Sequence, residues 1–346
     1  MVLNETKKLR LLLILGLIIH IIFISFLWGV QRNNINLNSK LSFDEDIKDD
    51  NNVLISYLES YNHVLYGLRG FVTSSEKITQ EEWNLYTKSL NITDTYPGLK
   101  TLFYLPYIPH NSKNTFINNL KNDYKNIASN ISFNLEWENR TAYFPVQYTY
   151  PFEETKLIIG QDYMQSTNIS RAINDSIDKG IATATVTKEI EQTLPKEVDY
   201  LVFLPIYNKY QVLDTLEQRQ NQIFGIVGLS LDIDELVAKS YTSFKNNRQV
   251  YLEVFDVTDN LLSNKIVVAG NSEIAKENKG FDVYSISIGG RNLEFKFKAE
   301  EYYRTNIVLI RNTDIFFTIV LLLGIVALIL TYRIISIKRL KTQYSI

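Results

Sequence analysis

Two long apolar runs, at residues 11–30 and 315–332, lie near the two ends of the chain and bracket a mixed, largely polar segment. At a rise of about 1.5 Å per residue, about 20 helical residues cover about 30 Å, the thickness of the hydrocarbon core of a bilayer. A backbone in hydrocarbon must satisfy its own polar groups, which a helix does. Both runs therefore predict transmembrane helices.

The charges beside these runs predict their orientation. Basic residues flank the outer ends of the two runs: Lys7, Lys8, Arg10, Arg333, Lys338, Arg339 and Lys341. Acidic residues instead crowd the start of the middle segment, at positions 44–50. By the positive-inside rule, segments 1–10 and 333–346 are cytoplasmic and the middle of the chain is outside the cell. The expected localisation is the cell membrane, either plasma or bacterial inner, which the chain crosses twice.

The first run has an alternative as a secretory signal peptide, whose apolar part would be about 7–15 residues long and would end in small residues. This run is longer, and Trp28 stands near its end, where interfacial aromatic residues belong. We therefore predict an uncleaved anchor. His20, inside the run, is either a functional ionisable group or a neutral side chain packed against a partner helix.

Apolar residues at helical spacing predict a long helix soon after the first run. They recur every three or four positions: Leu54, Tyr57, Leu58, Tyr61, Val64, Leu65, Leu68, Phe71 and Val72. A second helix opens with a capping box of Thr79 and Glu82. The residues that it is expected to bury are Trp83, Tyr86 and Leu90. Together these helices form a stalk over residues 31–96, and the apolar stripe either is a dimer face or is buried within one chain.

Beyond the turn at Pro97-Gly98 the pattern changes to short strands and helices. The predicted elements are strands at 99–108, 144–150, 157–163, 181–187, 200–207 and 224–231, and helices at 112–124 and from a capping Thr167 to 178, before Gly180. A second set comprises a helix at 232–241, strands at 250–257 and 265–269, a hairpin of 283–288 and 293–298 turning at Gly289-Gly290, and a helical lead at 300–311. The fold class is α+β, with two successive units, 97–230 and 231–300, each carrying a helix or two over one face of its antiparallel strands.

Composition excludes several classes of chemistry. The chain has 346 residues, a net charge of −2, three histidines and no cysteine. A near-neutral charge gives no reason to expect nucleic-acid binding, and no two histidines stand at metal-ligand spacing. Neither a G-x-S-x-G elbow nor a G-x-x-x-x-G-K-[ST] phosphate loop is present. We therefore predict no catalytic residues, no metal and no cofactor, and a protein that is not an enzyme.

Seven short motifs follow one another along the middle segment. They are FVTSS at 71–75, YPGL leading to LFY at 96–104, FPV at 144–146, GQDY at 160–163, RAI with DKG at 171–180, LVFLPIY at 201–207, and GIVG followed by DIDEL at 225–236. In this order and with these gaps the chain resembles the CHASE domain. That family is the extracellular sensory module found ahead of histidine kinases and nucleotide or cyclic-di-GMP cyclases, including plant cytokinin receptors. The resemblance covers about residues 53–300, and the family also has the two flanking membrane spans.

The resemblance implies a long N-terminal stalk helix and two tandem PAS-like units, of which the membrane-distal one binds the ligand. Asp162 matches an aspartate that accepts hydrogen bonds from adenine in cytokinin receptors, and the alternative is that it accepts backbone bonds at the next helix start. Thr185 matches a pocket threonine, or else is an ordinary β-branched strand residue. Phe203 stands where those receptors have a threonine, which argues against cytokinin itself. Tyr104 is a further candidate by its strand position, with core packing as the alternative.

The function implied is that of a membrane-anchored outer sensor that binds a small molecule, either adenine-like or another planar or apolar compound. Binding would send a conformational signal across the membrane, and such receptors work as homodimers. The 14 residues after Tyr332 are too few for an output domain, so we expect a longer receptor or a histidine kinase or cyclase partner to supply it. The alternative function is a membrane-anchored interaction protein, or an enzyme, that keeps the fold without sensing a ligand.

Overall fold

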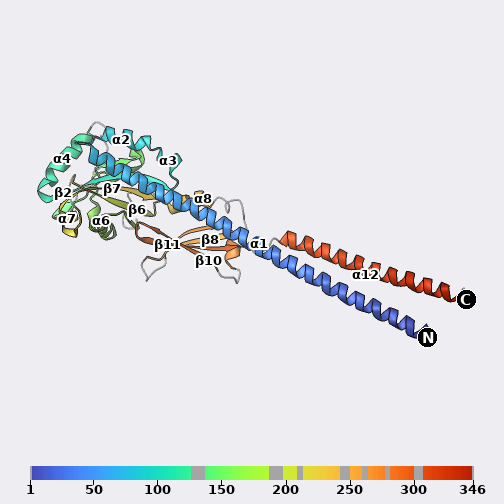
Figure 1. Ribbon diagram of the computed structural model, residues 1–346. Coiled ribbons are helices and arrows are strands. Elements are labelled where there is room, and N and C mark those ends of the chain that lie inside the picture. The colour runs from blue at the N-terminus through green and yellow to red at the C-terminus, as the bar shows by residue number, and fades with distance from the viewer. Residues whose placement is uncertain are drawn as a thin grey trace. The chain divides into compact units, whose positions relative to one another are not determined.

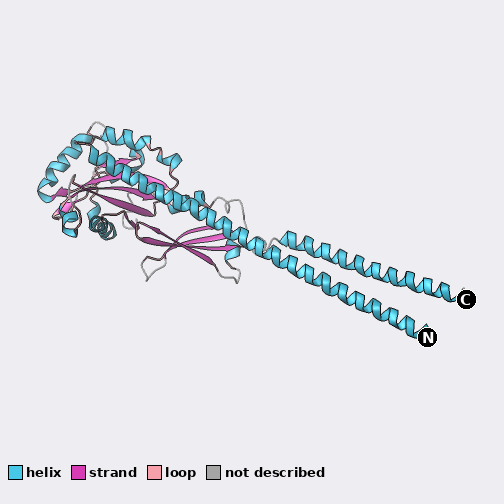
Figure 2. Ribbon diagram, in the orientation of Figure 1, coloured by secondary structure: helices cyan, strands magenta, loops and turns pink. Residues whose placement is uncertain are grey.

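The computed structural model describes residues 2–125, 137–186, 198–208, 213–241, 250–258, 264–270, 272–276, 281–299 and 307–344. The chain forms two compact units, one made of Met1–Ile47 with Ala299–Ile346 and the other of Lys48–Lys298. All the described strands belong to the second unit, where Figure 2 shows them gathered into separate groups. The long helix α1, Val2–Ser74, begins in the first unit and ends in the second.

The first unit contains two long apolar helices, the start of α1 and the whole of α12, Ile307–Tyr344 (Figure 1). The candidate membrane spans are Lys7–Ser74 and Val308–Lys338, and only 6% and 0% of their most apolar windows is buried within the protein. A core helix of a soluble protein would be mostly buried. Apolar surface that the chain itself leaves uncovered is what a lipid-facing helix presents.

Within this unit the two helices contact each other through polar groups. Trp28 Nε1 donates a hydrogen bond of 2.6 Å to Asp314 Oδ1. His20 Nε2 lies 3.3 Å from the carbonyl oxygen of Leu321, and its ring fills the space beside Gly324, where a Cβ would come within 2.0 Å of it. His20 therefore packs against a partner helix, which was the second of its two predicted alternatives.

The second unit buries the predicted stripe of α1 within one chain. The buried members of the stripe are Leu54, Tyr61, Val64, Leu65, Leu68 and Val72. Tyr61 donates a hydrogen bond to the carbonyl oxygen of Pro97, and with Leu65 it faces Val202 and Leu229 of the larger sheet. The stripe is thus a core surface, and the homodimer stays a prediction.

The larger sheet has five strands in the order β4-β1-β7-β6-β5, and every neighbouring pair is antiparallel. Its strands are β1 (Leu99–Pro106), β4 (Tyr148–Tyr150), β5 (Thr183–Val186), β6 (Tyr200–Tyr207) and β7 (Ile223–Leu231). They are apolar on both faces because helices cover both: α6 on one, α1 and α2 on the other. The prediction of helices over one face was therefore wrong for this sheet.

The shorter elements around this sheet follow their local signals. They are α2 (Gln80–Ser89), α3 (Ile92–Thr95), α4 (Lys113–Tyr124), α5 (Phe152–Thr155), α6 (Thr167–Lys179), α7 (Leu216–Asn221) and α8 (Ile233–Ser240), the 3₁₀ turns His110–Ser112, Lys156–Ile158 and Tyr163–Gln165, and the small sheet of β2 (Ile108–Pro109) and β3 (Ala142–Tyr143). The Thr79–Glu82 capping box is confirmed, and α2 buries Trp83 fully but Tyr86 and Leu90 only by half. Helix α6 ends at Gly180 as predicted, although the capping side chain is Ser166 and not Thr167.

Two strand predictions in this region were wrong. Only Tyr148–Tyr150 of the predicted strand 144–150 is a strand, because Pro145 has no N–H with which to continue a ladder. Residues 157–163 contain the end of a 3₁₀ turn and then Gly160 at a φ of 82°. An isolated bridge between Pro145 and Asp162 is all the strand pairing that this stretch has among the described residues.

The smaller sheet has four strands in the order β10-β11-β8-β9. Its strands are β8 (Val250–Asp256), β9 (Asn264–Gly270), β10 (Asp282–Ile288) and β11 (Arg291–Ala299), and the short helix α10 (Ser272–Ala275) follows β9. The predicted hairpin turn is confirmed, with Gly289 and Gly290 at φ values of 53° and 83°. The predicted helical lead is helical from Ile307, and residues 300–306 lie outside the described part. The unit bounds 97–230 and 231–300 and the PAS-like identity stay predictions.

Candidate functional site

Alternation along β1 separates two environments. Phe103 and Leu105 belong to the apolar core under α6, whereas Tyr104 lies between them in sequence and packs 6.4 Å, between ring centroids, from Trp83 of α2. Successive side chains of a strand point to opposite faces of the sheet. We call the two sides the α6 face and the α2 face.

An aromatic cluster occupies the centre of the α6 face. The ring centroids of Phe103 and Tyr163 are 5.7 Å apart, those of Phe103 and Phe203 also 5.7 Å, and those of Tyr163 and Phe203 6.3 Å. Gly228 lies under this cluster, and a Cβ there would come within 2.2 Å of the Phe103 ring. Phe103 can therefore pack on the α6 face because residue 228 has no side chain.

Asp162 lies beside this cluster, immediately before Tyr163. Its Oδ1 accepts hydrogen bonds from the main-chain N–H groups of Phe144, at 2.9 Å, and Met164, at 3.2 Å. The residue is 1% exposed, and its Oδ2 is buried without a hydrogen-bond partner among the described residues. Oδ1 thus caps the turn, as the predicted alternative stated, while Oδ2 has no partner among the described residues.

Burial raises the pKa of Asp162 above its ordinary value, against the opposing effects of the Phe144 and Met164 hydrogen bonds and the positive charges of Arg140 and Lys113. Arg140 is held in place by hydrogen bonds from Nη1 to the Met164 carbonyl oxygen and from Nη2 to Glu138. Its Nε is buried and has no partner in the described part of the chain. The site therefore holds an acceptor and a charged donor that are both shielded from water.

A third unpaired group comes from Tyr163, whose hydroxyl is buried without a partner among the residues described. Burial raises its pKa, so the hydroxyl stays protonated and remains a donor. Thr101 and Ser230, which pair across β1 and β7 on the same face, also have buried hydroxyls without partners in the described structure. Buried polar groups are normally hydrogen-bonded, so each of these groups calls for a partner that the described residues do not supply.

The wall beside Asp162 is built from aromatic rings and one lysine. Trp137 Nε1 donates a 2.8 Å hydrogen bond to the carbonyl oxygen of Gly160. Lys113 donates to the Trp137 carbonyl oxygen and lies 5.0 Å from the ring centre of Tyr143. These contacts fix the turn that presents Asp162. The described residues contain no cluster of three His, Asp or Glu side chains placed to hold a metal ion.

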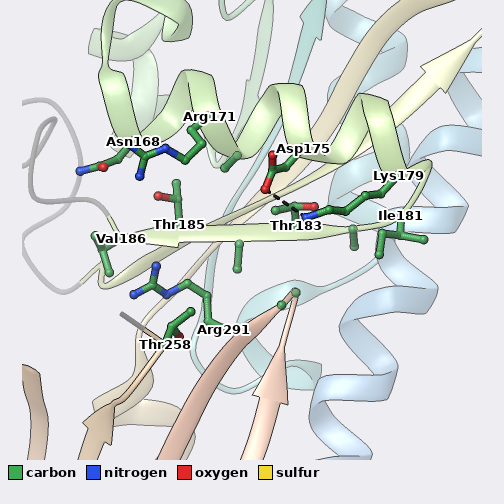
Figure 3. Close-up of a pocket in the computed structure, with 15 residues that line it drawn as sticks. Asn168, Arg171, Asp175, Lys179, Ile181, Thr183, Thr185, Val186, Thr258 and Arg291 are labelled. Carbon is green, nitrogen blue, oxygen red and sulfur yellow. Dashed lines mark hydrogen bonds and ion pairs between the residues drawn. The ribbon is translucent and has the colours of Figure 1, made fainter. Parts of the chain in front are cut away.

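The structure brings together two of the four predicted site residues. Phe203 packs against Tyr163, the residue that directly follows Asp162, on the α6 face. Thr185 lies on the edge strand β5 and lines a separate cavity of about 390 Å³ (Figure 3). Tyr104 lies on the α2 face, where it lines a cavity of about 340 Å³ with Tyr148 and Phe224. A ligand role for any of the four stays a prediction.

Several residues of this site were not predicted from the sequence. Tyr163 directly follows Asp162 in the GQDY motif, so the motif held a signal that its hydroxyl mattered. Arg140 comes from a polar segment that precedes β3, and nothing in its spacing pointed to Asp162. Gly228 was part of a quoted motif, but the need for a bare Cα under Phe103 depends on packing between strands.

These features define an α+β domain with a buried polar site, flanked in the chain by two candidate membrane-spanning helices, the arrangement of a two-pass membrane protein. The CHASE domain family model matches residues 76–264, which is more than half of the chain, and the chain belongs to that family. CHASE domains are extracellular sensory domains, so the class of this protein is an extracellular sensor domain.

Two further comparisons add little to this assignment. No curated protein matches the chain. A solved structure, an extracellular ligand binding receptor from Desulfohalobium retbaense DSM5692, is similar over 78% of this chain, at 10% sequence identity and a TM-score of 0.36. The match spans 40% of the length of that receptor. The family assignment therefore rests on the family model.

Proposed function

We propose that this protein is a membrane-anchored receptor module that binds a small molecule on the α6 face, next to Asp162. The central segment lies outside the cell and both termini lie in the cytoplasm, in accord with the basic flanks of the two apolar runs. Residues 97–230 hold the ligand, and residues 231–300 connect this part to the second membrane helix.

The observation that carries this proposal is the free Oδ2 of Asp162. Leaving a buried acceptor unpaired costs about 1–3 kcal/mol, more if it is charged, so a fold keeps one only where something offsets that cost. The Tyr163 hydroxyl and Arg140 Nε are two further donors without partners among the described residues, one on the residue that follows Asp162 and one on a side chain that bonds Met164. A small molecule with an apolar body and both donor and acceptor groups at one edge fits this set.

The aromatic cluster sets the shape of such a ligand. Phe103, Tyr163 and Phe203 pack against one another with ring centroids at most 6.3 Å apart, and all three are buried, so a ligand reaches their faces only when this packing opens. Planar compounds stack well on such rings. An adenine-like or other flat heterocycle therefore suits the site better than an extended sugar.

Binding would act on the output through a shift between conformations. The ligand would favour one packing of the sheet against α1, whose first half is a candidate membrane helix. The size of the signal is limited to the difference in ligand affinity between the two conformations. A histidine kinase or cyclase, joined to this chain or bound to it, would read the change.

The test is a thermal-shift screen of the full chain in nanodiscs against a small-molecule library that includes adenine derivatives. Fluorescence of Trp83 and Trp137 reports unfolding of the outer part. A ligand of the folded state raises the melting temperature by linkage. We expect a hit whose affinity falls at least about tenfold in Asp162→Asn, which keeps the Oδ1 acceptor and replaces Oδ2 with a donor.

Asp94→Asn is the matched control, because Asp94 is an exposed aspartate on α3 and should leave affinity unchanged. A hit that Asp162→Asn and Asp94→Asn leave equally strong would place the ligand elsewhere. Absence of any hit, from protein with a cooperative unfolding transition, would instead favour an interaction protein that does not sense a small molecule.

A further inference from the structure

A second cavity lies at the junction of the two sheets, within the same unit. It has a volume of about 390 Å³, at the lower end of the range of about 300–1,000 Å³ typical of small-molecule sites. Its walls come from α6, from the edge strand β5, from the turn between β10 and β11, and from Thr258 (Figure 3). Neither Asp162 nor Phe203 lines it.

The floor of the cavity is the edge strand of the larger sheet. Strand β5 is the last in the order of that sheet, and no further strand among the described residues bonds its outer side. The Ala184 N–H points outward, because it donates a 2.8 Å hydrogen bond to the carbonyl oxygen of Gly289. Outward and inward groups alternate along an antiparallel strand, so the main-chain N–H of Val186 also points outward, into the cavity that Val186 lines.

The side chains around this edge are predominantly cationic. The charged side chains that line the cavity are Arg171, Lys179, Arg291 and Asp175. Lys179 pairs with Asp175 at 3.1 Å, and Arg291 pairs with Asp256 at 2.6 Å, which leaves Arg171. Arg171 is exposed and makes no hydrogen bond or ion pair with the described residues. Among the residues that the structure describes, the Arg171 charge at this cavity is therefore not neutralised.

The second arginine is held in a fixed position at the opposite wall. Arg291 Nη2 lies 2.6 Å from Oδ2 of the buried Asp256, and Tyr200 donates to the same oxygen at 2.7 Å. Figure 3 shows Arg171 and Thr185 on the α6 side of β5, and Arg291 and Thr258 on its other side. Donors thus approach the β5 edge from two directions, with one wall supplied by each sheet.

We propose that this cavity is a binding site for a small organic anion, distinct from the site at Asp162. Arginine side chains bind carboxylate and phosphate groups through paired hydrogen bonds. Arg171 and the Val186 N–H hold the anionic group, Arg291 in its ion pair with Asp256 forms the opposite wall, and Ala172, Ile181 and Ala184 contact the apolar part of the ligand. Because the walls belong to different sheets, the bound anion links the two. The inference does not depend on the proposed function of the Asp162 site.

The experiment is isothermal titration calorimetry on the full chain in nanodiscs at constant ionic strength. The probes are succinate, citrate and pyruvate for carboxylates, and inorganic phosphate and glycerol 3-phosphate for phosphates. We expect saturable binding of at least one probe, and the chemical class of that probe identifies the anionic group. Arg171→Gln should weaken it about 10- to 100-fold, the range for a charge-assisted hydrogen bond. Folding should be unaffected, since Arg171 is exposed.

Two controls separate this site from others. Lys121→Gln removes an exposed cation from α4, outside the cavity, and should leave the affinity unchanged. Asp162→Asn should also leave it unchanged. The proposal is overturned if no probe binds, if Lys121→Gln weakens binding as much as Arg171→Gln, or if Asp162→Asn abolishes binding while Arg171→Gln does not.

Discussion

The two faces of the five-stranded sheet use the same kinds of side chain in opposite ways. On the α2 face, Tyr148 donates its hydroxyl to the carbonyl oxygen of Ile78 at 2.7 Å, and Tyr61 donates to that of Pro97. On the α6 face, the hydroxyl of Tyr163 and Oδ2 of Asp162 are equally enclosed but have no partner among the described residues. One face uses its polar groups to hold the fold together, and the other leaves them unused.

This difference is one of degree, because Nε1 of Trp83 on the α2 face also lacks a partner in the described structure. The unpaired groups on the α6 face nevertheless include an acceptor and donors that gather around one turn. Internal packing alone gives no reason for such a gathering. Polar groups that packing encloses but does not satisfy are thus what distinguishes the proposed binding face from the α2 face.

The largest loss of stability is expected from a substitution that disrupts the packing of the α6 face. In Gly228→Ala, the new methyl would lie 2.2 Å from the Phe103 ring and 2.7 Å from the Val202 carbonyl oxygen. Neither the strand nor the ring can move far, so we expect a loss of about 3 kcal/mol in the free energy of unfolding. Urea unfolding of the full chain in nanodiscs, followed by tryptophan fluorescence, measures it.

Gly70→Ala is the control for this change. Gly70 is exposed on α1, and no atom of the described residues lies within 4 Å of the position that an alanine Cβ would take there. Alanine should therefore be neutral or stabilise by up to about 1 kcal/mol. Equal unfolding midpoints for Gly228→Ala and the unmodified protein would show that Phe103 does not depend on the bare Cα.

A matched pair of tyrosines tests the comparison directly. Tyr148→Phe removes a paired hydroxyl and should lower the free energy of unfolding by about 1 kcal/mol, since it leaves the Ile78 carbonyl oxygen without that bond. Tyr163→Phe removes an unpaired hydroxyl and should leave it unchanged or raise it by about 1 kcal/mol. Thermal and urea unfolding without ligand measure both. Destabilisation of similar size in the two variants would mean that the faces do not differ.

Much of this fold was predictable from sequence because local signals agreed with tertiary packing. The predicted strands that became β6, β7 and β8, and the hairpin at Gly289-Gly290, were confirmed. The wrong strand predictions lie at Pro145, which has no N–H to donate, and at Gly160, which has a positive φ. The spacing of the α1 stripe predicted an apolar face but not the surface that covers it, because that surface comes from distant parts of the chain.

The site was predictable only in part. The motif around Asp162 marked the correct turn, but the partners of its Oδ1 are the main-chain N–H groups of Phe144 and Met164, whose positions follow from the bridge to Pro145. Arg171 and Arg291 are 120 positions apart in the sequence and line one cavity only because β5 lies beside the turn of the other sheet. Long-range juxtaposition of this kind has no signature in a single sequence.

The smallest change in stability is expected at Asp199. Like Asp162, Asp199 is a carboxylate that accepts a main-chain hydrogen bond, so it tests how burial acts on such a group. Its Oδ2 accepts from Ile233 N at 2.8 Å. Burial, together with the negative charges of Asp232 and Asp234, raises its pKa from 3.8 to about 6. The folded protein therefore holds this proton more tightly than the unfolded chain. The stabilisation is complete below about pH 4 and is lost as the pH rises through about 6.

Asp199→Asn should remove this part of the pH dependence while keeping an acceptor for Ile233. Full burial would make the difference about 3 kcal/mol, but Asp199 is only half-buried, so we expect the variant to be about 1 kcal/mol more stable than the unmodified protein at pH 7.5 and equal to it at pH 4. Urea unfolding across this pH range measures the difference. A difference that does not change with pH would show that Asp199 does not titrate there, and would weaken the case that burial also controls Asp162.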